Sequence, residues 1–182
     1  RIGGAGQVAR DLSWIRLSVP YLEERLAMEF RPGHPVEPKV IERLATAART
    51  AVDHAESIGV ITPAHRRGAA VLALYAALLR GDEEALRRHC AQVTQLGDKW
   101  FRDDTTRCIG TTLPHLESAH AESVLRAWHQ TVGFKPAYFE IAWTAFRGGG
   151  KAQALAAARL ATKAFADRAF QQERDRLEQL AR

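Results

Sequence analysis

The sequence predicts an all-α fold on three observations. Apolar residues recur at helical spacing along nearly the whole chain, the period-2 alternation of strands is almost absent, and proline or glycine separates the helical segments. Only the stretch TTRCIGTT, 105–112, has a strand-like composition. With 46% hydrophobic and 26% charged residues over 182 positions, the chain has ordinary globular composition and enough apolar material for a sizeable core.

The N-terminal part is predicted to be a separate helical segment. Its helix covers about 8–30, with an apolar stripe that includes Trp14 and Leu22 and an interruption at Pro20. Proline and glycine after it prevent the helix from continuing. We therefore expect an N-terminal helical segment, 1–30, a Pro/Gly linker, 31–38, and a helical-hairpin repeat domain, 39–182.

Capping residues place the remaining helices. A second helix is predicted over 38–57, with Pro38 in its first turn and Gly59 as its C-terminal cap. A third follows over 63–80, behind Thr62 as N-cap. Further helices are predicted over 83–96, 103–113, 115–132, 135–147 and 151–180. The result is eight helices in four antiparallel hairpins.

Two of these hairpins repeat one another. LYAALLRGDEEALRRH, 74–89, and AWTAFRGGGKAQALAAAR, 142–159, each contain an aromatic residue, then Arg-Gly, a tight bend and a second helix with Ala-Leu near its start. The matched arginines, Arg80 and Arg147, are 147 − 80 = 67 residues apart. This offset is close to twice a period of about 34 residues, the length of a tetratricopeptide repeat.

Over about 62–165 the chain resembles the tetratricopeptide-repeat family. The matching positions are Tyr138, Ile141, Ala142, Ala145, Gly149, Ala154, Ala158 and Ala161 in the last hairpin, Leu74, Ala77, Gly81 and Ala85 in the earlier one, and Ala121, Val124 and Leu125 in a degenerate middle copy. The resemblance implies antiparallel hairpins stacked as a short right-handed solenoid, whose first helices line a concave groove for partners. Alanine at facing positions lets helix axes approach to about 8 Å.

The resemblance also implies a partner-binding surface. Tyr75 and Trp143 fall on equivalent groove-facing positions, and Phe139 and Arg147 accompany Trp143. Aromatic and arginine side chains are typical interface hot spots; the alternative is that these aromatics are core residues. We therefore expect a non-catalytic interaction or scaffolding domain that docks a peptide or helix. The formal charge of +5 favours an acidic partner. The C-terminal helix is available to cap the stack or to mediate self-association.

The stretch GGGKA, 148–152, raises the question of a phosphate-binding loop. That motif requires GxxxxGK followed by Ser or Thr after a strand, whereas Ala152 follows Lys151 and the preceding segment is helical. We expect the glycines to end a helix. Lys151, Arg159 and Lys163 remain candidate contacts for an anion or nucleic acid, so a basic nucleic-acid-binding domain is the alternative function. Acidic residues interleaved with the later arginines favour a solvated face.

A catalytic alternative comes from RTAVDH, 49–54. Arg49 and His54 form an R-x4-H that resembles the motif of HEPN-type ribonucleases, which implies activation of a ribose hydroxyl across a dimer. Thr50 stands where that family often has asparagine, and the flanking alanines favour packing. We rank a nuclease third, behind interaction and nucleic-acid binding.

Neither a metal nor a cofactor is expected. Glu117 and His120 form one E-x-x-H, but the di-iron motif needs a second copy. The spacing of Cys90 and Cys108 follows no zinc-finger pattern.

Composition also bears on location. Two cysteines without a CxxC pair favour a reducing cytoplasm, and the most apolar run, 68–79, is too short for a membrane span. The arginine- and alanine-rich composition is typical of a bacterial protein. Because the chain begins at Arg1 without methionine, we expect a processed product or a domain of a larger protein.

Overall fold

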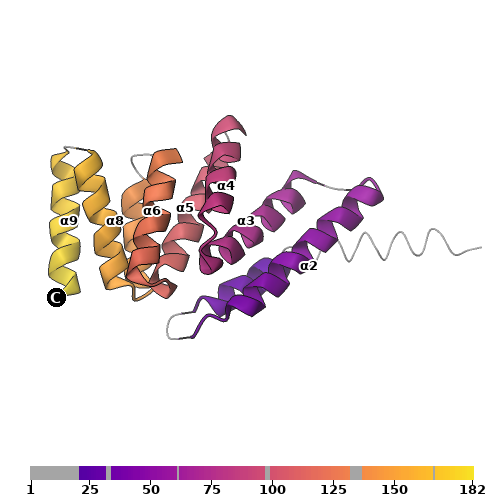
Figure 1. The fold of residues 1–182 in the computed structure, drawn as a ribbon, viewed down its shortest axis with the longest axis horizontal. Coiled ribbons are helices and arrows are strands. Elements are labelled where there is room, and N and C mark those ends of the chain that lie inside the picture. Colours follow the sequence, from indigo (N-terminus) through magenta and orange to yellow (C-terminus); the bar gives the residue numbers. More distant parts are fainter. Residues whose placement is uncertain (1–20, 32–33, 61, 97–98, 132–136, 166) are drawn as a thin grey trace, which may run out of the picture. The chain divides into compact units, whose positions relative to one another are not determined.

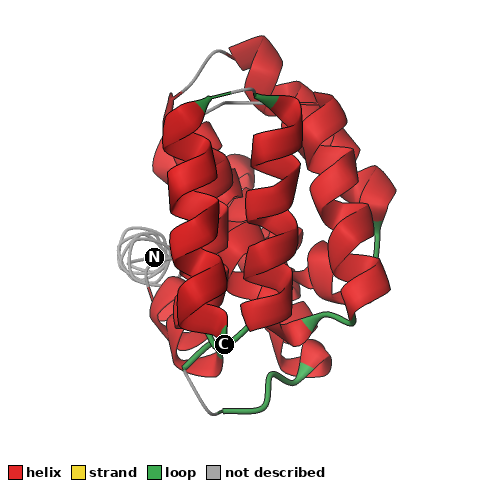
Figure 2. Ribbon diagram, turned by 90° about the vertical axis from the view of Figure 1, so that its left-hand side faces the viewer, coloured by secondary structure: helices red, strands yellow, loops and turns green. Residues whose placement is uncertain are grey.

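The computed structural model describes residues 21–31, 34–60, 62–96, 99–131, 137–165 and 167–182, and within these ranges all regular structure is helical (Figure 1, Figure 2). The all-α prediction is thereby confirmed for the described residues. They form two compact units, one up to Ala76 and one from Ala77 onward. The division falls inside a helix.

The first unit contains a helical stretch over 21–29, the helix α2 (Pro38–Ser57) and most of α3 (Pro63–Arg80). Both predicted helices, 38–57 and 63–80, are confirmed. The predicted residues 8–20, with Trp14 and Pro20, lie outside the described ranges. Along α2 the buried residues follow helical spacing and form its core face: Ile41, Ala48, Ala51 and Ala55.

The start of α3 is fixed by a reciprocal cap. The backbone N–H of His65 donates to Thr62 Oγ1 at 3.4 Å, and the backbone N–H of Thr62 donates to His65 Nδ1 at 3.3 Å. Histidine therefore takes the role that glutamate has in the usual capping box. The N–H of Thr62 thereby gains an acceptor, and the N–H of His65, which also donates to the carbonyl of Thr62 at 3.1 Å, gains a second one.

Three helices end in the same way, at a glycine in the left-handed region. The glycines are Gly59, Gly81 and Gly149, with φ of 71°, 77° and 90°. After Gly149, the N–H of Gly150 donates to the carbonyl of Ala145 at 2.9 Å, which closes the turn that follows α7 (Ala137–Arg147). The triple glycine is therefore a helix terminator, as the sequence predicts.

The second unit continues with short helices that pack on one another in alternation. Besides the end of α3 and α7, they are α4 (Glu83–Leu96), α5 (Lys99–Thr112), the 3-10 turn η1 (Leu113–His115), α6 (Ser118–Thr131), α8 (Lys151–Ala164) and α9 (Arg168–Ala181). α4 packs on α6, α5 on α7, and α8 on α6, α7 and α9. The strand-like stretch 105–112 is thus helical, within α5.

The sequence prediction of one helix over 151–180 is wrong. Phe165 adopts an extended conformation (φ −134°, ψ 115°) and ends α8, and Asp167 begins α9 as its N-cap, since its carboxylate accepts a hydrogen bond from the N–H of Ala169 at 2.9 Å. α9 then folds back onto α8. The ring of Phe165 packs between Tyr138 and Phe170, with centroid distances of 5.4 and 5.7 Å, which holds the break in place.

The centre of the second unit is the contact between α7 and α8. Each helix buries a row at three- and four-residue spacing, and both rows include alanine, which allows close approach. The buried residues of α8 are Ala154, Ala157, Ala158 and Ala161; those of α7 include Tyr138, Ile141, Ala142 and Ala145.

Candidate functional site

A groove with a cavity volume of about 740 Å³ runs between α6 and α8. It uses the face of α8 that lies opposite the buried alanine row, and one row of α6. The lining residues are Ser118, Ala121, Glu122, Leu125 and Arg126 on α6, and Ala152, Gln153, Leu155, Ala156, Arg159, Leu160 and Lys163 on α8. Their spacing of three and four residues is that of one helix face on each side.

The two helices that line the groove run in the same direction. At their starts, Gln153 Nε2 donates to the carbonyl of Leu116, just before α6, at 3.0 Å. At their ends, the ring of Tyr138 contacts Trp128 on α6 and Phe165 after α8, with centroid distances of 4.6 and 5.4 Å. The amino-terminal ends of α6 and α8 therefore lie at one end of the groove, and their carboxyl-terminal ends lie at the other.

The positive charges of the groove lie in the later halves of the two helices. Arg126 comes from α6, and Arg159 and Lys163 come from α8, whereas Glu122 is the one lining carboxylate. Within the described residues, neither Arg126 nor Lys163 has an ion-pair partner. The groove therefore combines exposed cations with the apolar side chains of Leu125, Leu155 and Leu160.

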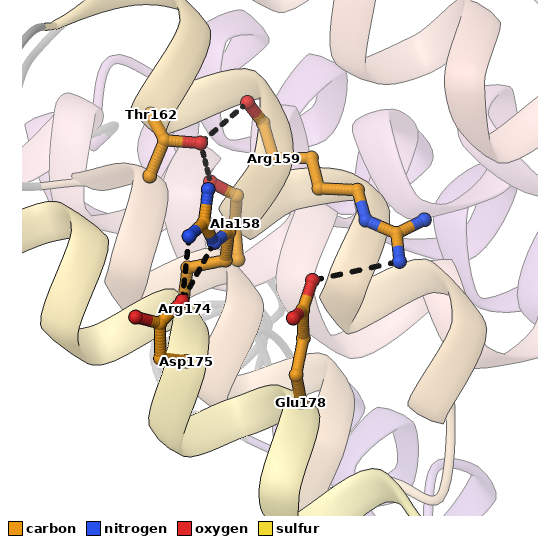
Figure 3. A network of polar contacts seen from close by, with 6 residues as sticks. All are labelled: Ala158, Arg159, Thr162, Arg174, Asp175 and Glu178. Carbon is orange, nitrogen blue, oxygen red and sulfur yellow. Dashed lines mark hydrogen bonds and ion pairs between the residues drawn. The ribbon is translucent and has the colours of Figure 1, made fainter.

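Arg159 is the cation that joins the groove to α9 (Figure 3). Its Nη2 lies 3.5 Å from Oε1 of Glu178, and the Arg159 side chain is 65% exposed. Nearby, the Thr162 hydroxyl donates to backbone carbonyls of α8, and Arg174 pairs with Asp175 at 2.6 Å. The hydrogen bond and charge of Asp175 raise the pKa of Arg174 above its ordinary value. Polar and charged contacts thus occupy this side of the α8–α9 hairpin.

The aromatic residues predicted to bind a partner lie against α9. Phe139 is buried, with its ring 4.8 Å from that of Phe170. Trp143 is half-buried, its Nε1 donates to Oε2 of Glu173 at 3.1 Å, and the guanidinium carbon of Arg176 lies 5.4 Å from its ring centre. In this structure, α9 therefore occupies the face of α7 that carries both side chains.

The other two predicted partner-binding residues are placed differently. Arg147 is exposed and its Nε donates to the carbonyl of Trp143 at 3.3 Å. Tyr75 belongs to the first unit, is buried at 6% exposure and contacts the ring of Phe30 at 5.0 Å. Phe139, Trp143 and Arg147 thus all lie on α7 in the second unit, whereas Tyr75 lies in the first unit.

Two of the three predicted anion contacts, Arg159 and Lys163, line the groove, whereas Lys151 does not. Lys151 Nζ donates to the carbonyl of Ala181 at the end of α9, at 3.5 Å. Sequence reasoning missed Arg126, which completes the set of cations. The signal available was the spacing of Ser118, Glu122 and Arg126 along one face of α6.

The residues of the nuclease and metal alternatives do not form a compact site. Arg49 and His54 both lie on α2, and a separation of five residues places them about 140° apart around the axis. Cys90 and Cys108 are buried without a disulfide between them. Among the described residues, no three histidine, cysteine or acidic side chains are grouped so that they could hold a metal ion.

The histidine and tyrosine side chains with shifted pKa values are His89, His115 and Tyr138, and none of them lines the groove. Burial lowers the pKa of His89, against an opposing effect of Asp104, and its Nε2 lies 3.1 Å from Oγ1 of Thr105. Burial also lowers the pKa of His115 and raises that of Tyr138, whose hydroxyl is hydrogen-bonded to Nδ1 of His129. The contacts of His89 and Tyr138 connect neighbouring helices.

Comparison with known protein families, curated proteins and solved structures found no match for this chain. Among the residues that the structure describes, no helix combines the length and the apolarity needed to cross a bilayer. The features that bear on function are therefore those of the groove itself: two parallel helices, apolar side chains between them and cations toward one end.

Proposed function

We propose that the second unit is part of a tetratricopeptide-like array of helical hairpins that binds an acidic, amphipathic peptide segment in the groove between α6 and α8. The domain would act as an interaction or scaffolding module without chemistry of its own. The observation that carries the proposal is the grouping of Arg126, Arg159 and Lys163 around apolar side chains of the groove.

Three features of the helices support the repeat-like arrangement. Successive hairpins place α7 on α5 and α8 on α6, and both the α3 and α7 helices end at a left-handed glycine. Small residues occupy the tight α7–α8 contact, at the positions Ala142, Ala154 and Ala158 that carry the family resemblance. The proposed site lies between the second helices of two hairpins, whereas the family resemblance implies a site on the first helices.

The groove dimensions fit a short helix. The lining residues span 118–126 on α6 and 152–163 on α8, which correspond to rises of about 12 and 17 Å at 1.5 Å per residue. A bound helix of about three turns has that length. Its apolar residues, at i, i+3 and i+7, would contact Leu155 and Leu160, which are partly exposed, and its carboxylates would face the cations.

A displayed peptide library tests this proposal. A library of about fourteen randomised residues is selected on the purified protein, and the strongest binder is synthesised with a fluorescent label. We expect selected sequences to be enriched in Asp and Glu beside apolar residues at helical spacing. In the double variant R126A/K163A, we expect the labelled peptide to bind about three- to thirtyfold more weakly, with a reduced salt dependence.

A pair of matched variants locates the binding site. Ala156→Glu places a bulky, negative side chain in the groove, whereas Ala119→Glu places the same side chain on an exposed position of α6 outside it. If the peptide no longer binds Ala156→Glu but still binds Ala119→Glu, the result supports the groove as the binding site. Selected peptides without acidic residues, or binding that ignores both Ala156→Glu and R126A/K163A, would contradict the proposal.

Nucleic acid is the competing ligand class. Titration of a labelled single-stranded RNA and a duplex DNA at low and near-physiological salt measures it directly. Binding that persists at physiological salt and is lost in R126A/K163A would assign the cations to phosphates and overturn the peptide proposal.

A further inference from the structure

Arg159 differs from the other two groove cations because it already has a carboxylate partner. Glu178, on α9, lies 3.5 Å from its guanidinium, and Glu178 is not itself a lining residue of the groove. Arg126 and Lys163 have no ion-pair partner among the described residues. Besides the lining residue Glu122, the chain therefore supplies a carboxylate from α9 to one cation of a groove that we propose to bind carboxylates.

The ion pair between Arg159 and Glu178 is of a kind that opens readily. Arg159 is 65% exposed and Glu178 33% exposed, and the separation of 3.5 Å is longer than that of a charge-assisted hydrogen bond. Pairs of this exposure contribute little to stability. An incoming carboxylate can thus replace Glu178 at small cost.

The attachment of α9 does not depend on this ion pair. Leu177, one residue before Glu178, is fully buried, and Phe170 packs on Phe139. Glu173 accepts a hydrogen bond from Trp143. Since these contacts hold α9 in place, Glu178 can release Arg159 without moving the helix.

We infer that Glu178 is an intramolecular competitor of the ligand: its carboxylate occupies Arg159 in the empty groove and must be replaced by a carboxylate of the bound peptide. This inference rests on the function proposed above and adds a specificity-determining residue to it. In the resting state, Glu178 lowers the affinity for all acidic segments. It also selects peptides whose own carboxylate reaches Arg159, because only these compensate for the lost ion pair.

The experiment measures the dissociation constant of the labelled acidic peptide from the library for wild type, Glu178→Gln, Arg159→Gln and the double variant. Glu84→Gln is the matched control. Glu84 is an exposed carboxylate on α4 that pairs with Arg88, and its substitution removes the same charge as Glu178→Gln. We expect Glu178→Gln to bind about two- to fivefold more tightly. Glu84→Gln should leave affinity unchanged, and Glu178→Gln should give no gain in the Arg159→Gln background.

The outcomes separate this inference from the proposed function. If the peptide binds wild type and responds to Ala156→Glu, but Glu178→Gln has no more effect than Glu84→Gln, the competitor role is wrong and the groove proposal stands. A gain that persists in the Arg159→Gln background also overturns the role, because it would be a general charge effect. If no peptide binds the groove of any variant, both proposals fail.

Discussion

The helix α8 takes part in two contacts of opposite character. Toward α7 it presents four alanines that are fully buried, Ala154, Ala157, Ala158 and Ala161. Toward α9 it makes polar contacts, among them the ion pair of Arg159 with Glu178, and Leu177 is the fully buried residue of α9. Figure 1 shows α8 between α6 and α9.

The two contacts therefore differ in role: the buried alanines determine how α8 packs, and the exposed charged residues can change partners. Close-packed small residues leave no space for another side chain, so the α7–α8 contact has one stable geometry. Exposed charges can exchange partners with little loss of stability. A helix that combines both is held by its α7 side, while the charged residues on its α9 side can exchange ion-pair partners.

The largest effect is expected from Leu177→Ala, which removes the buried aliphatic residue of α9. We expect a loss of about 2–5 kcal/mol, because a cavity is left where α9 meets its neighbours. The change in urea midpoint, with tryptophan fluorescence as the signal, measures it. Leu180→Ala is the control, since Leu180 is 51% exposed and should change stability by less than about 0.5 kcal/mol. Equal effects of the two substitutions would mean that α9 is not anchored through Leu177.

The α7–α8 contact is tested by Ala158→Leu. Extra volume at this fully buried position is expected to cost about 1–3 kcal/mol, because the facing helices cannot move apart without losing their packing. Ala156→Leu adds the same atoms on the groove side of the same helix, where space is open, and should be nearly neutral. Urea unfolding of both variants gives the comparison. Similar losses for both would remove the distinction between the two faces.

The turn between α7 and α8 is tested by Gly149→Ala. Its φ of 90° lies in the region that L-residues avoid, and a Cβ there meets no atom within 4 Å, so the expected loss of about 1–2 kcal/mol is conformational. Gly149→Asn should cost less, because asparagine tolerates left-handed conformations. Thermal unfolding followed by circular dichroism compares the two variants. Equal stability of Gly149→Ala and wild type would show that the turn does not need glycine.

The smallest effect is expected from Trp143→Phe, on the α9 side. The substitution keeps an aromatic ring but removes the donor to Glu173, and a hydrogen bond of this kind contributes about 0.5–1.5 kcal/mol. Hydrogen exchange of the α9 amides should increase while that of α7 stays unchanged. Equal acceleration in both helices would mean that α9 and α7 open as one unit.

The elements with local signals could be predicted from sequence. The helices 38–57, 63–80 and 83–96 match the structure, because Pro38, Thr62 and Gly81 act on the backbone next to them. The break after α8 was missed although Asp167 is a good N-cap. Neither glycine nor proline is present there, and Phe165 is held by Tyr138 and Phe170, which are distant in sequence or belong to the next helix.

The candidate groove could be predicted only in part. Arg159 and Lys163 are visible as a basic row on one helix, four residues apart. Arg126 joins them only because α6 and α8 lie side by side and run in the same direction, and that pairing is a tertiary property. The proposed aromatic site illustrates the same limit: helical spacing identifies Phe139 and Trp143 as one row, but not that α9 packs on it.

The parallel course of α6 and α8 has a consequence for ligand polarity. Since the cations lie toward one end of the groove, the two orientations of the proposed helical ligand would not be equivalent. A helix has a positive partial charge at its amino end and a negative one at its carboxyl end, and carboxylates are best tolerated near the former. A peptide and its reversed sequence have the same composition, yet the groove would distinguish them by chain direction alone.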